Sequence, residues 1–442
     1  MTFAYSRLNH VLRVPLAAEI HSRPFLKLEA PETITHLAVY RDNESGPPNG
    51  NALSQHVILA ALCAHFGVAA PVPGANYFYH DFGRFRLKWE CHTEFATYTF
   101  AEVSRQSAAL GEVFGRMPLA HLPQQWLASL EGRLMAAAYV LLEPGEGSVE
   151  DVQRAFEGNL LVGASVMQGA QLWTDFAIQP DGFSRFVVRD VGMRAQQAGR
   201  LVQRVLEIET YRMMALLGLP SAQQAGMELN AIEAELVALA GAMVATDAGP
   251  PGAQEGAVSD QALLDQITRL AARLEKMSLD NSYRFSASKA YFGLVKARIE
   301  ELREVRIEGV PTVEEFMDRR LTPAMNTCDA TAARQDALGR RIANTNDLLR
   351  TRVGIVQEMQ NRQILQSMNA RAALQLRLQQ SVEGLSVAAI SYYVIGLVSY
   401  LGKGAKEMGM VGHPDLVVSV LVPFVAAGVW LGLRHMHRRL HA

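Results

Sequence analysis

Two apolar stretches without a charged residue constrain this chain more than any other feature. They are Leu385–Leu401 and Leu416–Leu433, of 17 and 18 residues. A helix needs about 20 apolar residues to cross the roughly 30 Å hydrocarbon layer, so each stretch is near the minimal length of a span. Buried core helices are the alternative, but core helices rarely lack charge for so long. The pattern therefore predicts a two-helix transmembrane hairpin with spans at 385–401 and 416–433.

Basic residues flank this predicted hairpin. Arg371 and Arg377 precede the first stretch, and residues 434–442 form a basic tail after the second. Residues 402–415 make a short connection, so both flanks would lie on the same side of the membrane. The positive-inside rule assigns that side to the cytoplasm. We expect a protein of the bacterial inner (plasma) membrane, with two spans and with both termini in the cytoplasm.

Composition narrows the compartment and the partners. The formal net charge is −2, which provides no basic field for nucleic acid. Cys63, Cys91 and Cys328 are odd in number and show no CxxC or zinc-ligand spacing, which fits a reducing compartment. Residues 1–24 contain no apolar segment typical of a signal peptide. The expected partners are the lipid bilayer, other copies of the chain and ions, without nucleic acid or a cofactor.

Residues 1–190 alternate short strands with helices, as an α/β domain does. The predicted strands are Ile34–Arg41, Phe82–Glu90, Glu94–Glu102, Leu134–Leu142, Leu160–Ser165, Leu172–Gln179 and Phe183–Arg189. The predicted helices are Leu53–Phe66, Pro123–Ser129 and Val149–Glu157. We expect one mixed sheet covered by helices, forming an N-terminal cytoplasmic α/β domain.

Long helices follow in residues 191–322, the predicted helical hairpin region. They are expected at Val191–Leu217, Ala222–Val244, Gln261–Ser278 and Ser282–Ile307, with a Gly- and Pro-rich tip at Ala245–Asp260. A short helix is expected after Pro311, because Thr312 and Glu315 have capping-box spacing.

No proline occurs between Ala324 and Leu401. This predicts a stalk helix at 323–384 that continues into the first span, about 115 Å in all at 1.5 Å per residue. One ordinary domain does not cover a helix of that length, so it should pack on the hairpin before it or on copies of itself.

The first span and the end of the stalk have a small, polar face. It comprises Ser381, Gly384, Ala388, Ser391, Tyr392, Ile395, Ser399, Lys403 and Lys406. Two interpretations remain open. In the first, small residues allow helices to pack closely in lipid, and serine hydroxyls donate hydrogen bonds to backbone carbonyls of their own helix. Alternatively, the polar faces of several copies surround an aqueous pore.

The order of these elements resembles that of the CorA family of divalent-cation transporters. The resemblance covers the chain as architecture and is strongest over Asn344–Ala442, where a stalk helix, a first span, a short loop, a second span and a basic tail follow one another. It implies a pentamer with the first span around its axis. The CorA signature Gly-Met-Asn is absent: Gly402, Lys403 and Gly404 stand there instead, and a ring of lysines would repel a divalent cation.

The sequence also resembles an uncharacterised family of bacterial membrane-anchored proteins. The matching segments are Glu19–Pro24 (EIHSRP), Phe85–Phe95 (FRLKWECHTEF) and Glu383–Leu401, which contains the first span. This resemblance implies no activity.

A cluster of polar residues forms a candidate ligand patch: His21, Arg23, Arg84, Arg86, Lys88 and Glu90. Its last four members alternate along one strand face, opposite Phe85, Leu87 and Trp89. Either this face is solvated or interfacial, or it is an anion-binding or regulatory site. The histidines of the domain show no metal-ligand spacing, so a metal site is left unknown.

Two functions follow from these patterns. The leading hypothesis is an oligomeric inner-membrane protein of CorA-like architecture, an ion channel or transporter whose first span lines the pore. The alternative is a membrane-anchored cytoplasmic sensor or scaffold, in which the hairpin only anchors and oligomerises. No catalytic motif is present, so an enzyme is not expected.

Overall fold

The computed structural model describes residues 8–14, 16–17, 24–41, 50–104, 114–145, 149–156, 160–248, 259–407 and 414–440. The chain divides into two units, each described by itself. Unit 1 comprises Met1–Ala257 and Asp265–Thr345, and unit 2 comprises Val258–Leu264 and Asn346–Ala442.

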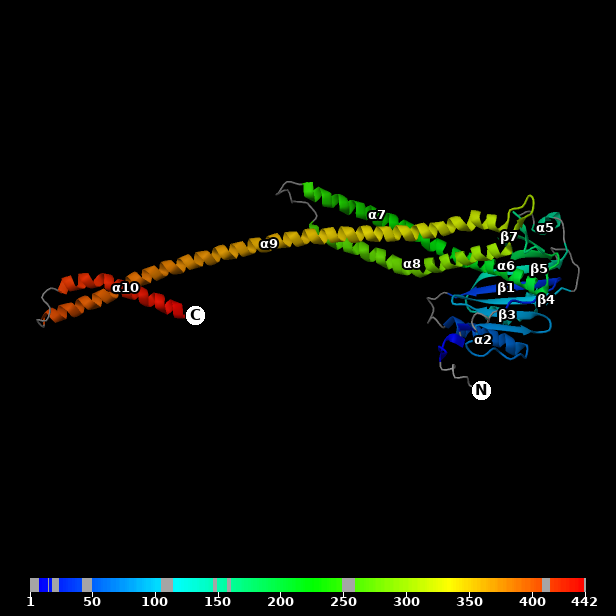
Figure 1. The fold of residues 1–442 in the computed structure, drawn as a ribbon, viewed down its shortest axis with the longest axis horizontal. Helices are drawn as coiled ribbons and strands as arrows, with labels where there is room; N and C mark the ends of the chain where they lie inside the picture. Colours follow the sequence, from blue (N-terminus) through cyan, green and yellow to red (C-terminus); the bar gives the residue numbers. More distant parts are fainter. Residues whose placement is uncertain are drawn as a thin grey trace. The chain divides into compact units, whose positions relative to one another are not determined.

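Unit 1 is organised around a nine-stranded mixed sheet, counted over the described residues, in the order β2-β3-β4-β1-β5-β8-β7-β6-β9 (Figure 1). The strands are β1 (Glu32–Tyr40), β2 (Tyr77–Asp81), β3 (Arg86–Cys91), β4 (Phe95–Val103), β5 (Arg133–Pro144), β6 (Val162–Val166), β7 (Ala170–Ile178), β8 (Ser184–Asp190) and β9 (Val305–Arg306). Strands β5 and β8 pair in parallel. The other pairings described are antiparallel.

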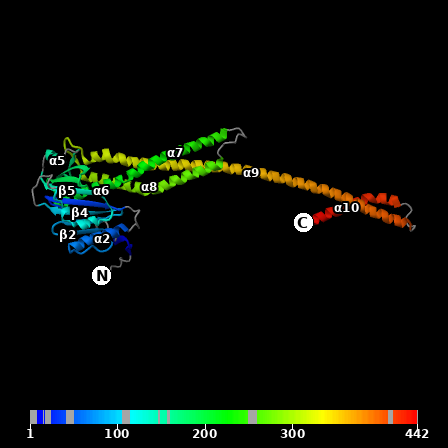
Figure 2. The ribbon, with the colours of Figure 1, turned by 180° about the vertical axis from the view of Figure 1, so that it is seen from behind.

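Both faces of the sheet are covered. The shorter helices are α2 (Gly50–His65), η3 (Pro118–His121), α4 (Gln124–Ala128), α5 (Val149–Ala155) and α6 (Ala195–Leu216). Helix α2 packs Leu59 and Leu62 against the Leu37 side of β1, at the β2–β4 end of the sheet (Figure 2). Helix α6 packs Leu201 and Val205 against the opposite side. Because alternate residues of a strand point to opposite faces, β1 is buried on both.

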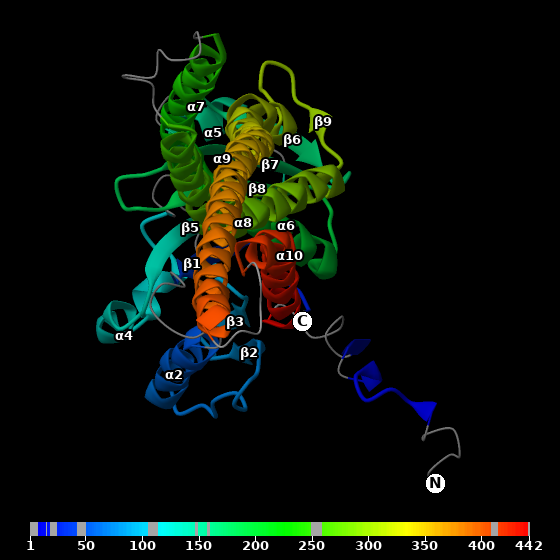
Figure 3. The same ribbon diagram turned by 90° about the vertical axis from the view of Figure 1, so that its left-hand side faces the viewer.

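Three long helices follow: α7 (Gly218–Ala248), α8 (Asp260–Leu302) and α9 (Val313–Glu407). In unit 1, α6 and α8 run side by side (Figures 1 and 3), and Arg204 of α6 pairs with Glu301 of α8. Arg334 of α9 pairs with Glu233 of α7 at 2.5 Å. The Gly- and Pro-rich tip was predicted between α7 and α8, and most of it lies outside the described residues.

Two helices are longer than the sequence pattern predicts. Helix α8 is continuous where two helices were expected, and α9 passes through Pro323 instead of starting there. A proline inside a helix costs about 3 kcal/mol because its ring removes a hydrogen bond. Here Met317, Leu321 and Met325 are buried in the domain core on both sides of Pro323. Burial of such side chains contributes about 1.5–3 kcal/mol each, which outweighs that cost.

Strand β2 was not predicted, and the strand expected at Phe82–Glu90 begins only at Arg86. The missed strand has the sequence YFYHD, which lies at the edge of the sheet with an uneven burial pattern. An edge strand has one partner and needs no clear alternation of apolar residues.

The predicted fold class is wrong in its membrane part. Among the described residues, one helix is long and apolar enough to cross a membrane, and it is the Val313–Gly404 part of α9. The second apolar segment is Ser419–Gly432, within α10 (Pro414–Leu440). At 1.5 Å per residue it covers roughly 21 Å, less than the hydrocarbon thickness of about 30 Å. The CorA-like two-helix hairpin is therefore not supported, nor are the cytoplasmic termini deduced from it.

Candidate functional site

The strand register brings polar side chains into a row on the face of the sheet that α6 covers. Lys88 of β3 lies opposite Thr99 of β4, and Thr99 lies opposite His36 of β1. Two residues further along, Glu90 lies opposite Thr97. Cross-strand neighbours on one face have Cβ atoms about 5 Å apart, so these side chains are adjacent. The register thus concentrates polar groups beneath a single helix.

Helix α6 contributes a matching polar stripe. Gln203, Glu207 and Thr210 follow at helical spacing and lie on one side of the helix. Gly199 belongs to the same side and lets the helix approach closely, because a Cβ there would meet the Leu26 carbonyl oxygen at 1.6 Å. The sheet and α6 therefore face each other with polar groups on both surfaces.

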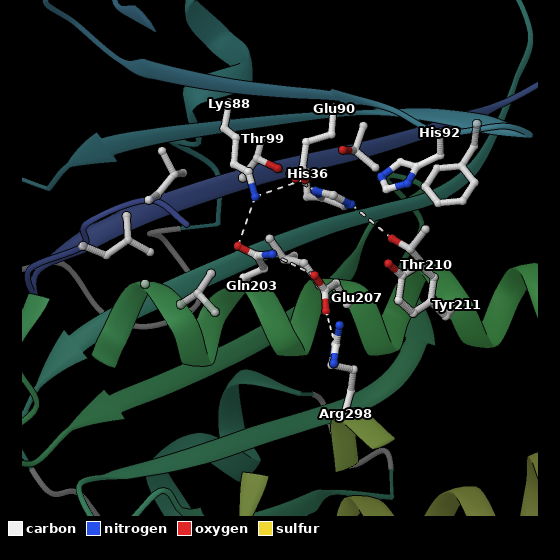
Figure 4. Close-up of a pocket in the computed structure, with 17 residues that line it drawn as sticks. His36, Lys88, Glu90, His92, Thr99, Gln203, Glu207, Thr210, Tyr211 and Arg298 are labelled. Carbon is white, nitrogen blue, oxygen red and sulfur yellow. Dashed lines mark hydrogen bonds and ion pairs between the residues drawn. The ribbon is translucent and has the colours of Figure 1, made fainter. Parts of the chain in front are cut away.

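A cavity of about 260 Å³ lies between these surfaces (Figure 4). We call it the α6 cavity. Its lining comprises Leu26, Leu28, His36, Lys88, Glu90, His92, Phe95, Thr97, Thr99, Gly199, Val202, Gln203, Leu206, Glu207, Thr210, Tyr211 and Arg298. Figure 4 shows Lys88 and Glu90 above the cavity and Gln203 and Glu207 below it.

A chain of hydrogen bonds and ion pairs crosses the α6 cavity. The Lys88 ammonium pairs with a Glu90 carboxylate oxygen at 3.0 Å and donates to the Gln203 side-chain oxygen at 3.0 Å. The Gln203 amide nitrogen donates to Glu207 at 2.7 Å, and Arg298 of α8 pairs with the other Glu207 oxygen. The Lys88 side chain is 5% exposed and that of Glu90 is 13% exposed. Gln203 thus links a charge pair on the sheet to a charge pair between two helices.

His36 is fully buried at the centre of the polar row. Its Nδ1 lies 2.9 Å from the Thr99 hydroxyl and its Nε2 lies 3.1 Å from the Thr210 hydroxyl. Burial, with Lys88 and His92 nearby, lowers the pKa of His36 to about 3. The ring is therefore neutral at pH 7 and connects β4, β1 and α6 through two hydroxyl groups.

The remaining walls are aromatic and apolar. His92 stacks on Phe95 with ring centroids 4.4 Å apart, and Phe95 meets Tyr211 of α6 edge to face at 6.4 Å. Leu26, Leu28, Val202 and Leu206 supply aliphatic surface. Thr97 is 5% exposed, and its hydroxyl has no hydrogen-bond partner in the part of the chain that the structure describes.

The structure brings together two of the six residues of the predicted ligand patch. Lys88 and Glu90 line the α6 cavity. Arg86 is held away from it by an ion pair with Glu32 and by a 2.6 Å hydrogen bond to the Lys27 carbonyl.

Of the other three members of the patch, the structure describes only Arg84. Arg84 is exposed in the turn between β2 and β3, where it lines a separate hollow with Asp81 and His121. His21 and Arg23 lie outside the described residues.

Several cavity residues were missed from the sequence. His36, Thr97 and Thr99 sit inside apolar strands, and only the register shows that they are neighbours of Lys88 and Glu90. On α6, Gln203, Glu207 and Thr210 recur at helical spacing. The helix carries other polar residues such as Arg200, Arg204 and Arg212, so this spacing alone does not mark the cavity face.

The predicted pore stripe lies along α9. The Ser381 hydroxyl donates to the Arg377 carbonyl at 3.0 Å, the hydrogen bond to the preceding turn that serine typically makes in a helix. Ser391 is buried, and its hydroxyl has no partner among the residues described. Tyr392 and Lys403 are exposed. The side chain of Lys406 lies outside the description. Within the described ranges, no group of three or more His, Cys, Asp or Glu residues is placed to hold a metal ion.

Fold and site together define a class: a mixed-sheet domain covered by helices, with a polar cavity, joined to long helices of which one has the length and composition of a membrane span. The family model described as "Protein of unknown function (DUF3422)" matches residues 8–440, and the chain belongs to this family. No curated protein and no solved structure matches the chain. The matching family is not CorA, so the resemblance to those transporters gains no support.

Proposed function

We propose that this chain is a membrane-anchored ligand-binding protein. Its α/β domain takes up a small polar molecule in the α6 cavity, and α9 provides the attachment to lipid. The observation that carries the proposal is the set of charges around the cavity, with the buried Lys88 and partly buried Glu90 on one side and the partly buried Glu207 and Arg298 on the other. Buried ion pairs add little net stability, because desolvation offsets their attraction. Their concentration around a cavity therefore favours binding.

Binding without catalysis is the simpler use of this cavity. Both ring nitrogens of His36 are engaged by threonine hydroxyls, and its low pKa makes it a weak base. The described lining also lacks a serine or cysteine nucleophile. The alternative function from the sequence, a sensor or scaffold, agrees with these features.

For the location, we propose the bacterial inner membrane with the α/β domain on its cytoplasmic side. Cys63, Cys91 and Cys328 are buried thiols that form no disulfide among the described residues, as in proteins of reducing compartments. Membrane fractionation of the full chain tests this placement. Recovery of the protein in the soluble fraction after cell lysis would contradict it.

The ligand is sought with full-length protein in detergent. Thermal unfolding is followed with a library of small metabolites, and a ligand present at 100 times its Kd should stabilise unit 1 by about 2.7 kcal/mol. Lys88→Met should abolish the response, whereas Lys276→Met, an exposed lysine on α8, should leave it unchanged. If no compound raises the melting temperature, or if Lys88→Met responds like the parent protein, the proposal fails.

A second candidate function is ion conduction by an oligomer, such as a pentamer, in which copies of α9 surround an axis. The exposed Ser381, Tyr392 and Lys403 of the predicted stripe favour it, because exposed polar groups on several copies of one helix can face a common aqueous axis. Liposomes containing the purified protein should then conduct, and Ser381→Leu should reduce the flux. An absence of flux for every cation and anion tested would eliminate this candidate.

A further inference from the structure

The lysine, arginine and glutamate side chains that line the α6 cavity sum to zero charge. Lys88 is balanced by Glu90 on β3, and Glu207 is balanced by Arg298 between α6 and α8. His36 adds none, because burial lowers its pKa to about 3. A ligand with a net charge would leave one charge unpaired in a desolvated site, which is costly. The cavity therefore selects ligands whose charges sum to zero.

The two charge pairs also lie on opposite walls, and Gln203 joins them. A ligand that carries one negative and one positive group can enter between them. Its negative group accepts hydrogen bonds from Lys88 and the Gln203 amide, while its positive group donates to Glu207. Each protein charge then keeps an opposite partner, and no charge is left alone.

The rest of the lining describes the body of such a ligand. Leu26, Leu28, Val202 and Leu206 make an aliphatic wall that suits an apolar side chain. The Thr97 hydroxyl, buried in the lining and without a partner among the residues that the structure describes, gains a hydrogen bond from a polar ligand group. At roughly 30 Å³ per water-sized group, 260 Å³ accommodates about nine non-hydrogen atoms.

We propose that the α6 cavity binds a small zwitterion of the α-amino acid class with an aliphatic side chain. The carboxylate lies at Lys88 and Gln203, the ammonium at Glu207, and the side chain against the aliphatic wall. This inference rests on the proposed function and specifies its ligand.

Calorimetric titration of the full-length protein in detergent tests the class with three probes of one shape. Leucine carries both charges, 4-methylpentanoate lacks the ammonium group, and 3-methylbutylamine lacks the carboxylate. Because each probe without one group forfeits a charge-assisted hydrogen bond and leaves a protein charge unpaired, it should bind at least about 30-fold more weakly than leucine.

Two variants assign the ends of the ligand. Glu207→Gln should weaken leucine binding at least about tenfold while changing the affinity for 4-methylpentanoate less than threefold. Lys88→Met should weaken the binding of both compounds. Melting curves from Trp89, Trp126 and Trp173, which are buried in unit 1, show whether each variant is folded. If a variant is not folded, the comparison among the three probes on the parent protein decides the matter.

The outcomes separate this inference from the proposed function. Binding of 4-methylpentanoate within threefold of leucine would make the cavity an anion site and overturn the zwitterion. A second outcome is that leucine does not bind, while a nucleoside, sugar or dicarboxylate does bind and Lys88→Met abolishes that binding. This would overturn the zwitterion proposal and keep the ligand-binding function. Failure of every compound would overturn both.

Discussion

Replacing Gly199 with alanine should destabilise unit 1, although alanine is the better helix former. Gly199 lies within α6 where the helix meets the segment before β1. An added Cβ would stand 1.6 Å from the Leu26 carbonyl oxygen and 2.8 Å from its carbon. Both atoms are backbone, so the contact is not relieved by a rotamer change.

The magnitude follows from three contributions. Alanine in place of glycine stabilises a helix interior by about 1 kcal/mol. The carbonyl of Leu26 has to retreat by roughly 1.4 Å to reach a tolerable 3.0 Å, and overpacking of this kind costs about 1–3 kcal/mol. The shift also strains the 3.1 Å hydrogen bond from the Leu28 amide to the Ala195 carbonyl, worth about 1 kcal/mol. We expect a net loss of about 2 kcal/mol.

Intrinsic tryptophan fluorescence measures this loss in the full-length protein. Three of the four tryptophans, Trp89, Trp126 and Trp173, are buried in unit 1. For a unit of this size, a loss of about 2 kcal/mol should lower the melting temperature by roughly 3 °C. Gly226→Ala on α7 is the matched control, because a Cβ there meets nothing within 4 Å and should raise the melting temperature by roughly 1 °C. A Gly199→Ala protein that melts at or above the parent temperature would refute the packing argument.

Three further predictions concern the charges and the membrane helix. Lys88→Met should cost about 3 kcal/mol in denaturant unfolding, because it removes the lysine that pairs with the largely buried Glu90 carboxylate, and adding Glu90→Gln should recover at least half. The native pKa of His36 is lowered from 6.5 to about 3, so the unfolded chain takes up the proton first as the pH falls. Stability present above pH 6.5 should therefore decline by about 1.4 kcal/mol per pH unit down to pH 3, and urea titrations of His36→Gln should lack this contribution. Val394→Arg should shift the protein from carbonate-resistant membranes to the soluble or aggregated fraction, since an arginine at the centre of a span costs about 2.5–3.5 kcal/mol in lipid. Val356→Arg, in the stalk, should leave the protein in the membrane fraction. Equal behaviour of these two variants would argue against insertion of residues 385–401.

Local patterns were sufficient for much of unit 1. Strand β1 was predicted at Ile34–Arg41 and occupies Glu32–Tyr40, because a strand buried on both faces appears as a continuous β-rich run. The passage of α9 through Pro323 was not predictable, since it depends on core contacts of Met317 and Met325 that no local rule describes. The second span is unsupported for a different reason: α10 is 27 residues long, but the apolar segment described within it is only Ser419–Gly432, shorter than a span needs.

The candidate site shows the same division. Lys88 and Glu90 were found because alternation along one strand is local. His36 was noted only as one of several histidines, because its neighbours Thr99 and Thr210 lie 63 and 174 residues away in the chain. Arg86 was grouped with Lys88 on the correct face, yet Glu32 holds it outside the cavity. The alternation along a strand predicts on which face of the sheet a side chain lies. Which side chain it pairs with depends on the order of the strands in the sheet.

The position of the polar row argues that it is kept for a purpose other than stability. Along β1, His36 is flanked on the same face by Ile34 and Ala38, both fully buried in apolar clusters. An aliphatic residue at His36 would continue that surface and contribute about 1.5–3 kcal/mol of burial, without a ring that must remain neutral. The domain instead places a histidine, a lysine and threonines beneath α6. Local departures from an otherwise consistent apolar pattern mark functional sites in folded proteins, and this one surrounds a cavity. The α6 cavity is therefore the part of the molecule where ligand chemistry should be sought first.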